Sequence, residues 1–127
     1  MSEIEVSWVI ASERPKELAE FYAFVINGEI REGKNNQHFL IVDPTGLKIH
    51  IYRPSEKCTW QKMGHASSIC MATKPSLDPL SEIEEWSSRL ISNGATVVEG
   101  PRVESFGAES WIADPEGNYF LILAPLA

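Results

Sequence analysis

A pattern that occurs twice constrains this chain more than any other feature. Residues 39–54 and 110–125 each carry an apolar run, the tetrapeptide Asp-Pro-x-Gly and a second apolar run that ends at proline. Proline at the second position of a turn presets φ for type I geometry, and glycine suits the fourth position. Each copy is therefore expected to be a β-hairpin that turns at residues 43–46 or at 114–117. An internal repeat of this kind indicates two copies of one structural unit.

A stretch with helical spacing of apolar residues precedes each hairpin, at residues 17–26 and 82–91. Ser12 and Asp78 are the expected N-caps of these helices. The dipeptide Asn-Gly follows both stretches and is expected to end each helix in a left-handed conformation. The side chains expected to face the sheets are Leu18, Phe21, Tyr22 and Val25 in the first helix and Ile83, Trp86, Leu90 and Ile91 in the second.

Short apolar stretches complete each copy. Residues 5–11 and 66–72 align with one another and are expected to form a leading strand before each helix. Residues 29–32 and 96–99 are expected to form a short strand after it. Each copy is therefore predicted to be a β-α-β-β-β unit.

The predicted fold class is α+β, with two tandem units that form a curved mixed sheet around a cleft and carry their helices on the outer face. The units are expected at residues 1–53 and 65–127, with a linker at 54–64. A chain of 127 residues, 43% of them hydrophobic, can fill one sizeable core, which predicts a single domain.

The charge and cysteine content narrow the expected partners and location. Eighteen acidic and eleven basic residues give a net charge of −7 without a Lys/Arg cluster, so nucleic acid and membrane surfaces are not expected partners. No apolar run approaches the roughly 18 residues of a membrane span, and the first residues do not resemble a signal peptide. Two cysteines, Cys58 and Cys70, make no disulfide framework. Together these features predict a cytoplasmic protein.

The tandem units, with Phe21-Tyr22 late in the first helix and Asp-Pro-x-Gly before each last strand, resemble the vicinal oxygen chelate superfamily. That superfamily includes glyoxalase I, extradiol dioxygenases and bleomycin resistance proteins. The resemblance covers nearly all of residues 1–127. It implies a single glyoxalase/bleomycin resistance-like domain with a small-molecule cleft. It also implies a homodimer, since other members cover their exposed apolar sheet edges by pairing.

Metal-dependent members of this superfamily use two ligands from each unit, one near the start of the leading strand and one four residues past the turn glycine. Three or four such ligands hold a divalent ion and leave positions open for two substrate oxygens. The resemblance implies that the corresponding positions here are Ser7, His50, Ser68 (or Ser67 if the alignment slips by one) and Leu121.

Among those positions only His50 is a strong ligand, because a serine hydroxyl binds transition metals weakly and leucine offers no donor. His38 is expected opposite Ile51, on the other face from His50, and His65 at the end of the linker. No metal cofactor is therefore expected; the alternative is a divalent metal bound through His50.

The alternation of side chains along a strand predicts which residues line the cleft. The mixed apolar and polar lining is typical of a small-molecule pocket, and Trp60 and Phe106 are placed to close its mouth. The opposite faces, expected to contact the helices, carry Trp8, Ile10, Leu40, Ile49, Ile51, Trp111, Phe120 and Ile122. The expected lining is Ser7, Val9, Phe39, Ile41, Lys48, His50 and Tyr52 in the first unit, and Ser68, Cys70, Ser110, Ile112, Tyr119, Leu121 and Leu123 in the second.

Three functions stay open. The first is a metal-free protein that binds a small organic molecule in the cleft. The second is a glyoxalase-type lyase or isomerase, or a dioxygenase, that uses an unusual metal site or His50 as a general base, since imidazole has a pKa near neutrality. The third is a non-catalytic interaction module or a dimeric scaffold with an empty cleft. The structural alternative for His50 is a half-buried histidine that is hydrogen-bonded to a neighbour.

Overall fold

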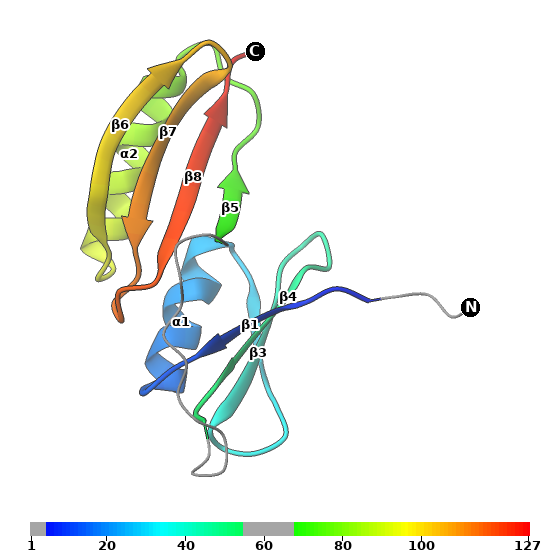
Figure 1. Ribbon diagram of the computed structural model, residues 1–127. Helices are drawn as coiled ribbons and strands as arrows, with labels where there is room; N and C mark the ends of the chain where they lie inside the picture. The colour runs from blue at the N-terminus through cyan, green and yellow to red at the C-terminus, as the bar shows by residue number, and fades with distance from the viewer. Residues whose placement is uncertain (1–4, 55–67) are drawn as a thin grey trace. The chain divides into compact units, whose positions relative to one another are not determined.

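The chain divides into two compact units, Met1–Lys62 and Met63–Ala127. The computed structural model describes residues 5–54 and 68–127, and each unit repeats the order strand, helix and three strands (Figure 1). The predicted α+β class and the two β-α-β-β-β units are confirmed. The predicted linker lies almost entirely outside the described residues, as do Cys58, Trp60, His65 and Ser67. Among the described residues no helix is long and apolar enough to cross a membrane.

The first unit has a mixed sheet of four strands in the order β1-β4-β3-β2, with β1 parallel to β4 and the other pairs antiparallel. The leading strand is shorter than predicted, and the strand after the helix has the predicted bounds. The elements are β1 (Trp8–Ala11), α1 (Pro15–Val25), β2 (Glu29–Glu32), β3 (His38–Val42) and β4 (Lys48–Tyr52).

The second unit repeats this topology in the order β5-β8-β7-β6. Its third element, β6, runs well past the predicted end at residue 99, because irregular pairing with β7 between Val97 and Arg102 accommodates Gly100 and Pro101 without ending the strand. The elements are β5 (Ile69–Ala72), α2 (Pro79–Ser92), β6 (Thr96–Glu104), β7 (Gly107–Ala113) and β8 (Tyr119–Pro125).

The Asp-Pro-x-Gly turns are confirmed, and both have the same hydrogen bonds. The N–H of Gly46 donates to the Asp43 carbonyl at 3.0 Å, and that of Gly117 donates to the Asp114 carbonyl at 2.9 Å. In each turn the aspartate Oδ1 also accepts from the backbone N–H groups two and four residues further on. Both glycines have positive φ, +94° at Gly46 and +88° at Gly117, which a residue with a side chain rarely adopts.

That positive φ lengthens each hairpin loop by one residue. The N–H of Asp43 donates to the Leu47 carbonyl at 3.0 Å, and that of Asp114 to the Asn118 carbonyl at 2.8 Å, so each loop has three residues rather than two. A three-residue loop with a left-handed glycine shifts the pairing of the two strands by one residue. This shift decides which side chains of β3 and β7 face the helix.

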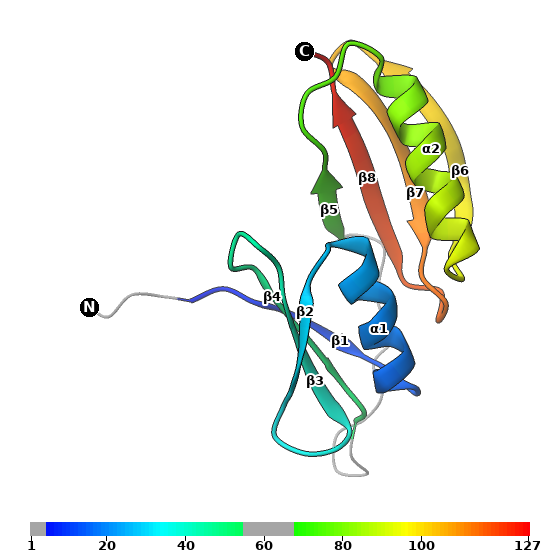
Figure 2. The same ribbon diagram turned by 180° about the vertical axis from the view of Figure 1, so that it is seen from behind.

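The helices cover one face of each sheet and leave the other face open (Figures 1 and 2). Directly paired residues share a face, and Leu40 pairs with His50 whereas Ile41 pairs with Ile49. Phe39 and Ile41 therefore face α1, and Leu40 lies on the open face. The prediction that Phe39 and Ile41 line the cleft and that Leu40 contacts the helix is wrong, because it assumed a two-residue turn.

The same correction holds in the second unit. Ser110 pairs with Ile122 and is buried on the side of α2, as is Ile112. Trp111 pairs with Leu121 and lies on the open face. The predicted places of Ser110 and Ile112 in the cleft, and of Trp111 against the helix, are therefore wrong for the same reason.

The two cores lie between each helix and its sheet. Leu18, Phe21 and Tyr22 of α1 are buried as predicted, while Val25 is half-buried. In α2 the buried side chains are Ile83, Ser87 and Leu90, so the buried stripe is narrower than predicted; Trp86 is half-buried and Ile91 is 50% exposed. The largest buried strand side chains are Ile10, Ile41, Ile49, Ile51, Ile112, Phe120 and Ile122.

The helix ends agree with prediction in three places of four. Asp78 caps α2 by accepting from the backbone N–H of Ser81 at 3.3 Å. Asn27 and Gly94 follow the two helices with φ of +52° and +102°. Ser12 is not the N-cap of α1: that position is Arg14, whose backbone N–H donates to the Ser12 hydroxyl at 3.0 Å.

Candidate functional sites on the open faces of the two sheets

The open face of the first sheet carries polar side chains along β4, which lies between β1 and β3. Lys48, His50 and Tyr52 occupy alternate positions of β4, so all three lie on one face. Val9 of β1 and Leu40 of β3 pair with His50 from either side. Of the predicted lining in this unit, the structure brings together Val9, Lys48, His50 and Tyr52, and Ser7 lies half-buried just ahead of β1.

His38 contacts His50 on this face. The Nε2 atom of His38 lies 3.0 Å from Nδ1 of His50, and the rings stack with centroids 5.2 Å apart at an interplanar angle of 29°. The prediction that His38 lies on the opposite face is wrong, because His38 pairs with Tyr52 rather than with Ile51. The one-residue shift of the hairpin therefore creates a histidine pair that sequence reasoning missed.

Hydrogen bonds determine which nitrogen of each ring carries the proton. The backbone N–H of Lys34 donates to Nδ1 of His38 at 3.0 Å, so that nitrogen has a lone pair and the proton of a neutral His38 sits on Nε2. His38 then donates to Nδ1 of His50, which leaves the His50 proton on its own Nε2. Burial lowers the pKa of His38, with smaller contributions from the nearby His50 and Lys34, which favours this neutral form.

Gly33 allows the His38 ring to take this position. A Cβ atom on Gly33 would lie 2.3 Å from Nδ1 of His38, which is far inside van der Waals contact. The Gly33 N–H also donates to the His38 carbonyl at 2.8 Å. The glycine is thus required for close approach, and the backbone around residues 33 and 34 holds both the main chain and the ring of His38.

Lys48 forms an ion pair with Glu5 at the edge of this face. The hydrogen bond from Lys48 and its charge lower the pKa of Glu5, with a smaller contribution from His50. Both side chains are more than a third exposed, so the pair contributes little to stability. It places a carboxylate of this chain beside the ammonium group of Lys48 on β4.

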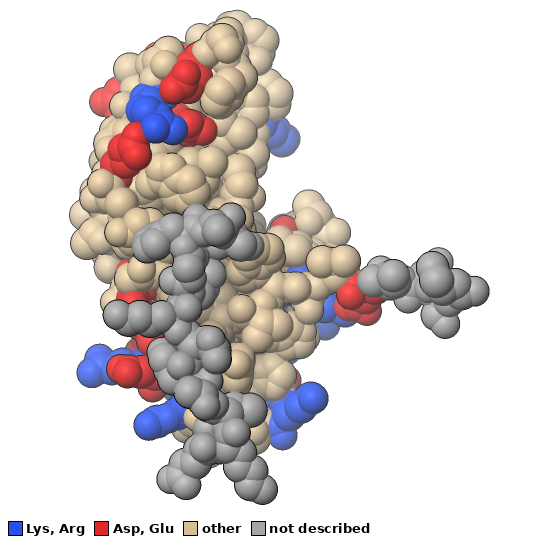
Figure 3. All heavy atoms as spheres, in the orientation of Figure 1, with Lys and Arg blue, Asp and Glu red and all other residues tan. Residues whose placement is uncertain are grey.

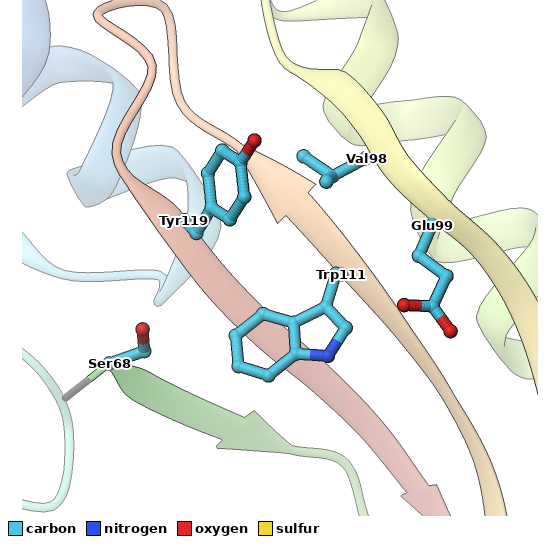
Figure 4. Close-up of a pocket in the computed structure, with 5 residues that line it drawn as sticks. All are labelled: Ser68, Val98, Glu99, Trp111 and Tyr119. Atoms are coloured by element: carbon cyan, nitrogen blue, oxygen red, sulfur yellow. The ribbon is translucent and has the colours of Figure 1, made fainter. Parts of the chain in front are cut away.

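A pocket of about 360 Å³ lies on the second unit (Figure 4). Its lining comes from β6, β7, β8 and the residue ahead of β5, and consists of Ser68, Val98, Glu99, Trp111 and Tyr119. The structure thus brings the predicted Ser68 and Tyr119 together with three residues that were not among the predicted lining. Trp111 was missed because of the strand register. Val98 and Glu99 were missed because no lining residue was expected from the predicted strand at 96–99.

A cluster of charged side chains lies beside this pocket. Figure 3 shows it over β6, with a basic side chain surrounded by acidic ones. Arg102 forms ion pairs with Glu99 and Glu109, and its Nε lies 3.7 Å from Glu104. These carboxylates raise the pKa of Arg102, with the hydrogen bond to Glu109 as the largest cause. One guanidinium against three carboxylates leaves this cluster with an excess of negative charge next to the pocket.

Cys70, Leu121 and Leu123 also lie on the open face of the second sheet, beyond the residues that line the pocket. Cys70 is exposed. Partial burial of the thiol and the charge of Glu109 raise its pKa, so the nucleophilic thiolate is disfavoured. Phe106, predicted to close the mouth of a cleft, lies 51% exposed between β6 and β7.

The residues at the superfamily's ligand positions do not fit a divalent metal ion. Ser7 and Ser68 supply neutral hydroxyls, Leu121 supplies no donor, and Nδ1 of His50 is already engaged with His38. No group of three or more His, Cys, Asp or Glu side chains is placed to hold an ion within residues 5–54 and 68–127.

Comparison with known proteins identifies a family for this chain and several solved structures with a similar fold. Residues 7–123 match the family described as Glyoxalase-like domain, and no curated protein sequence matches significantly. Hypothetical protein SA1046 from S. aureus is similar with a TM-score of 0.77 at 12% identity, covering 98% of this chain and 95% of that one. The fosfomycin resistance protein FosX from Listeria monocytogenes has a TM-score of 0.72 at 18% identity, with coverages of 98% and 94%. A glyoxalase/bleomycin resistance protein from Albidiferax ferrireducens T118 has 0.66 at 18%, with 94% and 97%.

Proposed function

Because the chain belongs to the glyoxalase-like domain family, we propose that it binds a small planar organic molecule on the open face of its second unit, without a bound metal ion. The match confirms the predicted resemblance to the superfamily of glyoxalases, bleomycin resistance proteins and dioxygenases. A fold of this kind hosts several functions, so the proposal depends on the residues of the pocket.

The main support for this proposal is that Trp111 and Tyr119 line the same pocket. Two aromatic side chains offer flat apolar surfaces for a planar ring, and each has a polar atom that can orient it (Figure 4). Ser68 and Glu99 add a hydroxyl and a carboxylate. A few polar groups among apolar walls, in a volume near the lower end of the roughly 300–1,000 Å³ range, are typical of small-molecule sites.

The charge beside the pocket favours a neutral or cationic ligand over an anionic one. Glu99 lines the pocket, and Arg102 is shared between Glu99, Glu104 and Glu109. A negative cluster repels an anion and attracts a cation at short range. The names of two structural neighbours refer to resistance to bleomycin and to fosfomycin, which supports an organic molecule as the ligand class.

Binding of a planar dye tests this proposal directly. 9-Aminoacridine, a planar cation, is expected to bind saturably in a fluorescence anisotropy titration, and acridine-9-carboxylate is expected to bind more weakly. Trp111→Ala should weaken binding of the cation about tenfold, the size expected when a stacking partner is lost. Trp86→Phe is the matched control, because Trp86 lies on α2 outside the pocket lining. Equal affinity of native protein and Trp111→Ala, or no saturable binding, would contradict the proposal.

A role for His50 as a general base is less well supported. A base needs a lone pair that faces the substrate, and the hydrogen bonds of His38 and Lys34 assign the His50 lone pair to Nδ1, where His38 already donates. We therefore place binding ahead of catalysis.

A homodimer is part of the proposal. Val103 and Phe106 lie close together where β6 ends and are 68% and 51% exposed, and an exposed apolar patch of this kind is a common site of contact between subunits.

A further inference from the structure

We infer that the open face of the first sheet binds a carboxylate or phosphate group of a ligand, and that His38 is the positioning residue that fixes His50 as an N–H donor toward it. This inference concerns the first unit alone. It stands or falls independently of ligand binding in the pocket of the second unit.

A fixed order of hydrogen bonds leads from the backbone to His50. The Lys34 N–H can only donate, so Nδ1 of His38 accepts, Nε2 of His38 donates, and Nδ1 of His50 accepts. The remaining nitrogen, Nε2 of His50, therefore carries a proton. Within residues 5–54 and 68–127 no acceptor is hydrogen-bonded to it.

The reverse arrangement conflicts with the backbone. If Nε2 of His50 were to offer a lone pair to a metal or a proton, the His50 proton would move to Nδ1 and His38 would have to accept it. The proton of His38 would then face the Lys34 N–H, which places two donors 3.0 Å apart. The pair of rings therefore favours ligands that accept a hydrogen bond at His50.

Two further hydrogen-bond donors lie on the same face of β4 as His50. Lys48 and Tyr52 flank His50 at alternate positions of β4, each about 6.6 Å along the strand, and contribute an ammonium and a hydroxyl group. Val9 and Leu40 lie beside His50 and supply apolar surface for the rest of a ligand. An anionic oxygen is the group that satisfies an ammonium and an imidazole N–H together.

A carboxylate of the chain itself already lies at this place. Glu5 pairs with Lys48, which lies two residues from His50 on the same face of β4. Glu5 is exposed and precedes β1, so a ligand carboxylate or phosphate can displace it at little cost. The ion pair of Glu5 with Lys48 supports an anionic oxygen as the group that binds on this face.

The tautomer of His50 is measured with ¹⁵N-histidine-labelled protein at pH 7.5, by long-range ¹H–¹⁵N correlation. His50 is expected to show a protonated Nε2 and an unprotonated Nδ1. His38→Ala should give a rapidly exchanging mixture of both tautomers, and His38→Gln, whose amide can donate to the same nitrogen, should restore most of the native pattern. A native His50 protonated at Nδ1 would overturn the inference. Circular dichroism confirms that each variant is folded.

Ligand binding is measured by following the same signals during titration with benzoate and with phenyl phosphate, which distinguishes the two acceptor groups. At least one should bind saturably and shift the His50 Nε2–H signal, whereas benzyl alcohol should not. Glu5→Gln should tighten binding about threefold, because it removes the competing carboxylate, and Lys48→Met should weaken it about tenfold. Failure of both anions to shift His50, in native protein and in Glu5→Gln, would refute the inference.

Discussion

Truncation of two neighbouring residues tests the register of the first hairpin. Ile41→Ala and Leu40→Ala each remove three carbon atoms, one residue apart on the same strand. Ile41 is fully buried, so its loss should cost about 2–5 kcal/mol, which includes the cavity left beneath α1. Leu40 is half-buried on the open face, and its loss should cost about 1 kcal/mol, since the site is partly hydrated already.

Urea unfolding followed by far-UV circular dichroism measures this difference, with the slope m checked for constancy among variants. In thermal unfolding, the expected difference of about 1–4 kcal/mol between the two variants corresponds to a difference in Tm of roughly 4–15 °C for a chain of this size. Ile112→Ala is the corresponding truncation in the second unit, where Ile112 is fully buried on the side of α2 and its loss should cost a similar free energy of unfolding. If Leu40→Ala costs as much as Ile41→Ala, the three-residue loop and the assignment of the faces are wrong.

Four further predictions follow from the same structure. Stability should fall as the pH drops below about 6.5, because the lowered pKa of His38 lets the unfolded chain take up a proton first, and the unfolding profile of His38→Gln should be flatter. Gly46→Ala and Gly117→Ala should each lower the unfolding free energy by about 1 kcal/mol in urea titrations, because both glycines have positive φ. Metal-stripped protein should show no rise in Tm with Zn²⁺ or Ni²⁺. A stoichiometric ion whose binding His50→Ala abolishes would contradict the conclusion that these side chains do not fit a divalent ion. Sedimentation at micromolar concentration should show a dimer. A monomer would refute the proposed homodimer and leave the proposed ligand binding unaffected.

The amino-acid sequence by itself determined the elements and their order. The repeated Asp-Pro-x-Gly turns, the apolar spacing of the helices and the Asp78 cap are local features, and local hydrogen bonds and side-chain periodicity are enough to predict them. The resemblance also identified the positions of Ser7, His50, Ser68 and Leu121, and the nature of those side chains already made a metal site of the usual kind unexpected.

The faces of β3 and β7 were decided only by the tertiary structure. Residues 39–42 are apolar at every position, so the sequence of this strand does not indicate which side chains face the helix. The pairing with the next strand determines this. One extra loop residue, a glycine with positive φ, places the side chains of each of these strands on the face opposite to the predicted one. That shift brought Trp111 to the pocket and His38 to His50, because a slip of one residue in a strand moves every side chain to the opposite face.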